Sequence, residues 1–464
     1  MTAGVLFTLA ACQAKRPDAA RSIPSDPDQH LVFVYLDPLP AGPEGLELRI
    51  DSVSAVREDG PASPLTLAFD RVVAGKGARE RLLASGGVPA GRYTELELRF
   101  AAAAAAGEEG RTDLAVPPEG TRTAVHFVAE RGRSTVLRLK LDPRTPASGE
   151  VRFEPLLAAA VPDRLATGLT GLAVDREAGA VFLFDKVAGQ VVGAVRTGRR
   201  PGGMAVDLVR ARAYVPVGGE DAIVTIDVAA GAVIDRIPLT GGDDPAEVVL
   251  SPDGSTLLCA NAGSGTVSIV DARSLFETRR VTVGNAPRSL LLDAAGTRAF
   301  VFNSLSDSIS VLDVAAGTLV ATLAADSGPL RGAFDRAQRR LYVINRSSPY
   351  LTVFDPVSLS IVKKVYVGAG ATALAVDPRT DRIYLSRRNT GSVEIYDPQS
   401  FLPVDTMPAA GEVAHLAVDR QGNLLYLSLS RSRAVRAVRL VGQGTVWDAD
   451  LPGEPSWVSL MGER

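Results

Sequence analysis

Apolar and polar positions alternate in a repeating pattern along residues 163–464, and most copies of the pattern end at one aspartate. Successive aspartates are 42, 44, 42, 42 and 42 residues apart. They are Asp185, Asp227, Asp271, Asp313, Asp355 and Asp397. A seventh, degenerate copy ends another 42 residues on, at Arg439. A repeat of this length is typical of one four-stranded sheet, so the pattern predicts seven such sheets arranged as blades.

Two columns of residues within each copy predict its strands. Four residues before the recurring aspartate the side chain is aliphatic, as at Val267, and the next residue is mostly polar or variable, as at Ser268. This alternation predicts a half-buried strand. Two adjacent apolar residues, such as Tyr342 and Val343, stand thirteen and twelve residues before the recurring aspartate. We expect their strand to be buried on both faces, between neighbouring sheets.

The first copy lacks the strand that opens the others. Middle copies begin with a proline turn and a short strand, as at 245–250 and 287–292, whereas the first copy starts at Thr170 without one. The missing pattern stands at the other end of the chain, in Gly-Glu-Pro-Ser-Trp-Val-Ser-Leu at 453–460. We therefore expect the C-terminal strand to complete the first blade, because a closed ring hides sheet edges that invite aggregation.

Residues 29–162 show a different pattern, with alternating apolar segments at 31–35, 46–50, 93–100 and 135–141. Clusters of glycine and proline separate these segments, and none has the period of a long helix. The alanine run at 101–106 is interpreted as part of a loop. The sequence thus predicts an all-β protein, with an N-terminal β-sandwich followed by a seven-bladed β-propeller over 163–464 that the C-terminal strand closes.

Several short motifs in the repeats resemble those of a known family. The segments Tyr-Val-Ile-Asn at 342–345, Phe-Val-Phe-Asn at 300–303 and Ser-Pro-Asp-Gly at 251–254 resemble the bacterial propeller repeat named for its Tyr-Val-Thr-Asn tetrapeptide, found in the YncE-like family. The resemblance covers residues 163–464. It implies a seven-bladed propeller in a secreted or envelope protein, and it implies no established reaction.

The N-terminal domain has a resemblance of its own. Val-Pro-Ala-Gly-Arg-Tyr-Thr at 88–94, with segments at 137–142 and 152–155, resembles a lipoprotein domain of unknown function, number 4382. That family transfers no ligand to this chain, because a shared sandwich fold does not identify what is bound.

The first residues predict that the protein is located in the cell envelope. Residues 4–11 form a short apolar run ending in alanines, which is too short to span a bilayer but is typical of a secretory signal. Leu-Ala-Ala-Cys at 9–12 resembles the lipobox of bacterial lipoproteins, although residues 1–3 lack the usual lysine or arginine. The resemblance implies a signal peptide at 1–12, a tether at 13–28 and a lipid anchor on Cys12. Gln13 after this cysteine favours an outer-membrane location over the inner membrane. The alternative interpretation of residues 4–11 is an apolar N-terminal strand and no signal peptide.

Composition narrows the chemistry. The chain has 50 basic and 53 acidic residues and a net charge of −3, so it carries no overall basic field for nucleic acid. Its two cysteines and three histidines are too few and too scattered for a zinc finger, a haem-attachment motif or a three-histidine site. We therefore expect no bound metal and no cofactor. Separately, we expect the protein to be a monomer.

One column of residues forms the candidate site. It lies two residues after each opening proline position, at the start of the strand nearest the ring axis. The column consists of Gly203, Glu247, Ser289, Arg331, Ala373, His415 and Trp457. These groups are expected to converge at one mouth of the central channel, where propellers commonly bind ligands. The candidate binding residues are Glu247, Arg288, Arg331, His415 and Trp457; the alternative is that they only cap the channel with water and one Glu–Arg pair.

Other conspicuous residues have structural interpretations. Each recurring aspartate precedes a turn, where a short carboxylate accepts hydrogen bonds from backbone N–H groups, so a structural role is favoured over catalysis. Cys259 stands in a column of alanine, valine and leucine and is interpreted as a buried small hydrophobe.

Two classes of function follow. The favoured one is a non-catalytic envelope module that binds another protein, a glycan or a small ligand through its propeller. The alternative is an envelope hydrolase resembling the seven-bladed lactonases, which would need several axial carboxylates or histidines to hold a divalent metal. The axial column offers one carboxylate, Glu247, and one imidazole, His415, so binding is favoured.

Overall fold

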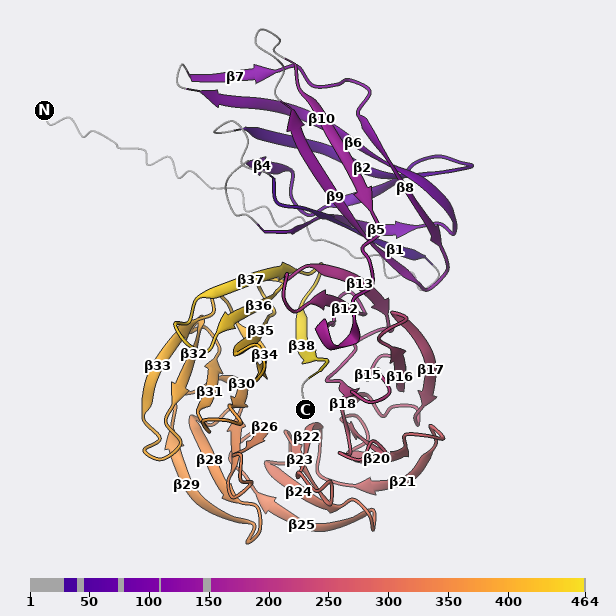
Figure 1. The fold of residues 1–464 in the computed structure, drawn as a ribbon. Helices are drawn as coiled ribbons and strands as arrows, with labels where there is room; N and C mark the ends of the chain where they lie inside the picture. The colour runs from indigo at the N-terminus through magenta and orange to yellow at the C-terminus, as the bar shows by residue number, and fades with distance from the viewer. Residues whose placement is uncertain (1–28, 40–45, 74–78, 108–109, 145–151, 463–464) are drawn as a thin grey trace, which may run out of the picture.

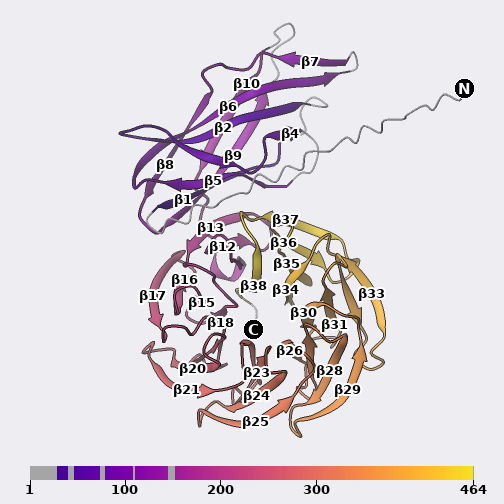
Figure 2. The ribbon, with the colours of Figure 1, turned by 180° about the vertical axis from the view of Figure 1, so that it is seen from behind.

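The computed structural model describes residues 29–39, 46–73, 79–107, 110–144 and 152–462. Within these ranges the chain forms 38 β-strands and one short 3-10 helix, Thr167–Leu169. Among these residues there is no helix with the length and apolar character to cross a membrane. Figures 1 and 2 show a curled sheet beside a ring of blades, so the predicted all-β fold is confirmed.

Ten strands form the curled sheet. They are β1 (His30–Leu36), β2 (Glu47–Arg57), β3 (Ser63–Leu67), β4 (Arg71–Val73), β5 (Arg81–Val88), β6 (Gly91–Gly107), β7 (Gly110–Leu114), β8 (Thr121–Ala129), β9 (Ser134–Arg144) and β10 (Glu154–Ala160). Their order is β10-β9-β1-β5-β3-β2-β6-β7, with β4 beside β2 and β8 beside β6. Because β3 pairs with both β5 and β2, the sheet folds over a core that includes Val34, Leu98 and Leu139, which gives the predicted sandwich-like domain.

The alanine run is a strand, and the loop interpretation was wrong. Residues 101–106 continue β6, where they pair with β2 and β7. Ala103 and Ala104 are buried, so the small side chains face packed neighbours. Pairing on both sides outweighs the weak strand propensity of alanine.

The ring consists of seven four-stranded blades. From the axis outward, blade 1 is β38 (Pro455–Leu460), β11 (Thr170–Asp175), β12 (Ala180–Asp185) and β13 (Val191–Arg196); blade 2 is β14 (Ala205–Asp207), β15 (Arg212–Val217), β16 (Ala222–Asp227) and β17 (Ala232–Pro238); blade 3 is β18 (Pro245–Leu250), β19 (Thr256–Asn261), β20 (Thr266–Asp271) and β21 (Glu277–Thr282); blade 4 is β22 (Pro287–Leu292), β23 (Arg298–Asn303), β24 (Ser308–Asp313) and β25 (Thr318–Ala324). Blade 5 is β26 (Pro329–Phe334), β27 (Leu341–Asn345), β28 (Tyr350–Asp355) and β29 (Ser360–Tyr366); blade 6 is β30 (Ala371–Val376), β31 (Ile383–Arg387), β32 (Ser392–Tyr396) and β33 (Pro403–Pro408); blade 7 is β34 (Val413–Asp419), β35 (Leu424–Leu429), β36 (Ala434–Arg439) and β37 (Thr445–Asp450).

The repeated positions have the predicted structural roles. The adjacent apolar pair on each second strand, such as Tyr342 and Val343, is buried between sheets. Each of the six recurring aspartates accepts a backbone N–H two or three residues ahead; Asp355, for example, accepts from Val357 at 2.8 Å. Cys259 is fully buried, and burial raises the pKa of its thiol, as expected for a residue that only fills space.

The C-terminal strand closes the ring as predicted. Strand β38 pairs antiparallel with β11, with Val458 opposite Ala173 and Leu460 opposite Gly171. Blade 1 therefore contains strands from both ends of the propeller sequence, and its inner edge is covered.

The curled sheet packs on the outer edge of blades 1 and 7 (Figure 1). Strand β1 is buried along its whole length. Val32 belongs to the sandwich core, whereas Phe33 and Tyr35 pack against the ring. The Phe33 and Phe182 rings meet edge to face with centroids 5.0 Å apart, and the Tyr35 hydroxyl donates to the Asp450 carbonyl at 3.0 Å. The two domains thus share a continuous apolar seam.

One carboxylate is buried in this seam. The Glu80 Oε1 accepts the Val191 N–H at 3.2 Å, and its Oε2 has no hydrogen-bond partner within the described part of the chain. The Arg138 Nε lies 4.0 Å from that oxygen, while the Arg138 guanidinium donates to Asp37. Burial raises the pKa of Glu80 to about 7.

Deleting residues 453–464 removes β38 and exposes the edge of β11. We expect the ring to lose its cooperative thermal transition, because blade 1 would have no inner strand. Circular dichroism melting of the deleted protein measures this, with Glu454→Ala, a change at an exposed residue, as the control. A melting curve like that of the parent would contradict the role of ring closure.

Replacing Glu80 with glutamine should change how stability depends on pH. The folded-state pKa of about 7 lies above the ordinary value of 4.5, so this group's contribution to the free energy of unfolding falls as pH rises through that window. The shift corresponds to about 3 kcal/mol. We expect the stability of Glu80→Gln relative to the parent to rise by an amount of that order between pH 4.5 and 7.5.

Urea unfolding of both proteins at several pH values provides the comparison, and the contributions of other carboxylates cancel in the difference. A difference that does not vary with pH would show that burial of Glu80 does not shift its proton affinity.

Candidate functional site

The innermost strands share a local irregularity that places the candidate residues. In β18 the pairing register shifts between Pro245 and Glu247, and the same shift recurs at the matching place in β22, β26, β30 and β34. A bulge of this kind re-aims the following side chain. The predicted column therefore lies around the axis, where Figures 1 and 2 show the inner strands gathered.

Four of the five candidate residues form one connected cluster across the axis. The His415 and Trp457 rings stack with centroids 3.9 Å apart, and the Arg331 Cζ lies 4.4 Å from the Trp457 ring centroid. An Arg331 Nη2 is 3.4 Å from a Glu247 carboxylate oxygen, and the Ser289 hydroxyl donates to the other oxygen at 3.1 Å. These four residues and Ser289 link the inner strands of blades 7, 1, 5, 3 and 4, and the five together are called the axial plug.

A glycine makes room for the axial plug. A Cβ on Gly203 would lie 2.7 Å from Trp457 Cζ3 and 2.8 Å from Glu247 Cγ. Both distances are shorter than real Cβ contacts, so a larger residue would push the indole away. The absence of a side chain at Gly203, in a column of otherwise larger groups, follows from the size of Trp457.

The plug contains a neutral histidine beside a cation. Burial lowers the pKa of His415 well below its ordinary value, and the charge of Arg331 lowers it further. The Val458 N–H donates to His415 Nδ1 at 3.4 Å, which leaves the ring proton on Nε2. Burial also raises the pKa of Glu247, against the opposing effects of Arg331 and Ser289.

A cavity of about 190 Å³ shares its lining with the plug and forms the channel mouth. The fifth candidate, Arg288, lines it together with Glu247, Arg331 and Trp457, whereas His415 is not among the lining residues. Three further arginines line the cavity and were missed by sequence reasoning. They are Arg176, Arg200 and Arg346. Arg176 and Arg346 each directly follow the second strand of a blade. Comparing the residue at that position across all the repeats could have identified them from sequence.

The charges of the channel mouth are only partly compensated. Arg200 pairs with Asp244 at 3.0 Å, and Arg331 pairs with Glu247 at 3.4 Å. The other three guanidinium groups, Arg176, Arg288 and Arg346, have no ion pair within the described ranges, and all three residues are exposed.

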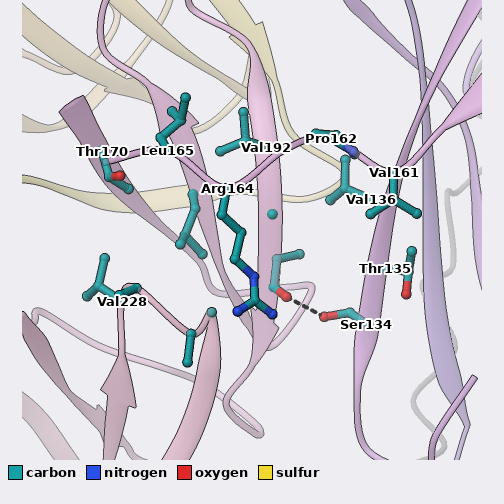
Figure 3. Close-up of a pocket in the computed structure, with 16 residues that line it drawn as sticks. Ser134, Thr135, Val136, Val161, Pro162, Arg164, Leu165, Thr170, Val192 and Val228 are labelled. Atoms are coloured by element: carbon teal, nitrogen blue, oxygen red, sulfur yellow. Dashed lines mark hydrogen bonds between the residues drawn. The ribbon is translucent and has the colours of Figure 1, made fainter. Parts of the chain in front are cut away.

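A second cavity, of about 200 Å³, lies at the seam between the domains (Figure 3). Strand β9, the linker after β10, β13 and the loop 228–231 form its walls. Across it the Ser134 hydroxyl donates to the Ala194 carbonyl at 2.7 Å, and Arg164 is its one charged residue. This lining is mainly aliphatic side chains and backbone, which suits packing between domains better than chemistry.

Metal-binding groups do not cluster in the part of the chain described here. No set of three or more histidine, cysteine, aspartate or glutamate side chains is placed to hold a metal ion among these residues. Cys12 and the signal and tether segments at 1–28 lie outside the described residues, so their predicted roles stay predictions.

Comparisons with known proteins agree with the ring. Residues 180–377 match the model of the YncE-like beta-propeller family. No curated protein matches the chain. The resemblance of the N-terminal domain to the lipoprotein domain of unknown function stays a prediction.

Solved structures share the propeller at low sequence identity. A functionally unknown protein from Desulfotomaculum acetoxidans is 12% identical with a TM-score of 0.56, over 64% of this chain and 99% of the other. Kuenenia stuttgartiensis hydrazine synthase is 18% identical with a TM-score of 0.53, over 59% and 93%. A putative 6-phosphogluconolactonase from Bacteroides uniformis is 16% identical with a TM-score of 0.53, over 64% and 100%. Identities this low establish the fold alone.

Proposed function

We propose that this protein, whose residues 180–377 match the YncE-like β-propeller family, is a non-catalytic binding module that binds its partner at the channel mouth. One observation carries the proposal: a cavity over the axial plug presents an indole, Trp457, and guanidinium groups that are not used in ion pairs within the described residues. Aromatic and arginine side chains in a concave site are the groups most often responsible for binding energy.

Binding is favoured over hydrolysis by how the two titratable plug residues are bonded. The Glu247 carboxylate is held by Ser289, by the Leu290 N–H at 3.4 Å and by Arg331. The His415 Nδ1 accepts a backbone N–H, and its ring is covered by Trp457. A general base needs a free acceptor within reach of substrate. The envelope hydrolase therefore ranks second, and the likeness to a putative lactonase supports it through fold alone.

We also propose where the module acts. The lipobox-like Leu-Ala-Ala-Cys at 9–12 supports lipid attachment at Cys12, and the proline-bearing segment 13–28 supports a tether between the anchor and the first domain. On this proposal the protein is a monomer held on the cell envelope, at the outer membrane, and its partner is an envelope protein, a glycan or a small ligand.

Loss of the Arg331 cation and the Trp457 indole should strongly reduce partner capture. Protein lacking residues 1–28 serves as bait in native envelope extract, read by mass spectrometry, beside the variant Arg331→Ala/Trp457→Ala. We expect partner recovery to fall at least about tenfold, because Trp and Arg anchors at a binding interface each contribute ~2 kcal/mol or more. The matched control is Arg339→Ala/Trp447→Phe, which changes the same residue types outside the cavity.

Melting curves of all three baits check that each is folded. Equal capture by the parent and the plug variant would place binding on other surfaces and contradict the proposal.

The lipid anchor is tested separately. In a bacterial host, the full-length protein should partition into the membrane fraction, and Cys12→Ser should leave it soluble or uncleaved, because a lipobox cysteine supplies the acylated thiol. Fractionation with metabolic fatty-acid labelling measures both properties. Labelling that survives the substitution would contradict attachment at Cys12.

A further inference from the structure

We propose that the channel mouth binds a small anion carrying at least two carboxylate or phosphate groups, held by Arg176, Arg288 and Arg346 above Trp457. This inference rests on the proposed function, because it names the ligand chemistry of the same cavity. The three arginines are called the arginine rim below.

The arginine rim is assembled by the fold from distant parts of the sequence. Arg176 follows β11 in blade 1, Arg288 lies in β22 of blade 4, and Arg346 follows β27 in blade 5. All three line one cavity. Three guanidinium groups from three blades surround that space, and such an arrangement suits a ligand that contacts several of them together.

The local charge of the cavity is opposite to that of the chain. Its lining contains five arginines and two acidic residues, Asp244 and Glu247, which gives a formal charge of 5 − 2 = +3. The whole chain carries −3. Both acidic residues already pair with arginines, Arg200 and Arg331, so the uncompensated positive charge belongs to the arginine rim.

Guanidinium chemistry selects the ligand class. Each guanidinium presents a planar fork of donors that matches the paired oxygens of a carboxylate or phosphate. A singly charged ion satisfies one fork, whereas three forks around one cavity match an anion with several charged groups. A neutral ligand would leave these cations without any compensating charge.

Two buried donors on residues that line the cavity also lack acceptors within the described residues. The Arg331 Nε and the Ser456 Oγ are buried and make no hydrogen bond within the described residues, although both residues line the cavity. Buried donors in folded proteins are nearly always paired. An anionic oxygen placed over Trp457 would accept from these groups.

The size of the site limits the ligand. A space of about 190 Å³ is smaller than the roughly 300–1,000 Å³ typical of sites for drug-sized molecules. The axial plug blocks deeper entry, since Trp457 is stacked on His415 at the axis. A compact anion fits, and a larger molecule could insert only a charged terminal group.

Isothermal titration of the protein with inorganic pyrophosphate and, separately, with citrate tests the inference at 20 mM and 150 mM NaCl. We expect saturable binding of at least one anion, weaker at the higher salt because the arginine rim is exposed. In Arg176→Ala/Arg288→Ala/Arg346→Ala we expect affinity to fall at least about tenfold, since charge-assisted hydrogen bonds are lost.

The matched control is Arg273→Ala/Arg339→Ala/Arg439→Ala, which removes three exposed arginines outside the cavity and changes net charge equally. It should bind as the parent does. Binding of pyrophosphate alone would identify a phosphate ligand, and binding of citrate alone a carboxylate ligand. Binding of neither anion, or equal loss in the control, would overturn the inference.

Envelope capture with the same variants separates this inference from the proposed function. If the rim variant still captures a partner that Arg331→Ala/Trp457→Ala loses, the binding module stands and the anion inference falls. If both variants capture it as the parent does, the channel mouth is not the site and both proposals fall.

Discussion

The pairing of β38 with β11 is the interaction on which the rest of the structure depends. It joins the last strand of the chain to the first blade, so the ring has no open inner edge. The same strand carries Trp457 to the axis, where the indole contacts groups from two other blades. The N-terminal domain packs on blades 1 and 7, the two blades that meet where the chain closes on itself. Fold stability and the candidate site therefore share one element.

The axial plug converts a channel into a shallow cavity. Across the axis, the His415 and Trp457 rings stack, Arg331 contacts the Trp457 ring, and Arg331 pairs with Glu247. Gly203 leaves the space that the indole needs. Their polar atoms are largely committed to the fold. The unpaired guanidinium groups come instead from around the plug: Arg176 and Arg346 directly follow the second strands of their blades, and Arg288 lies near the start of β22. A rigid base under a ring of cations is a physical arrangement suited to recognition.

Much of the fold was predictable because the repeat is regular. A spacing near 42 residues fixed the seven blades, and the displaced pattern at 453–460 identified the closing strand. The column containing Glu247 and Trp457 lies around the axis, and a register shift recurs beside this column in six of the seven inner strands. Arg176 and Arg346 were missed because they stand in turns, outside the alternation of the strands. The alanine strand and the buried Glu80 depend on contacts between distant segments, which local patterns do not encode.

Fluorescence of Trp457 tests the central claim, that ligands bind at the channel mouth. The chain has two tryptophans, and Trp447→Phe leaves Trp457 as the single reporter. The account predicts a saturable change in its emission as pyrophosphate, citrate or a captured envelope partner is added, with the same affinity that calorimetry gives. Calorimetric binding with unchanged Trp457 emission would mean that the ligand sits elsewhere, and it would contradict the account.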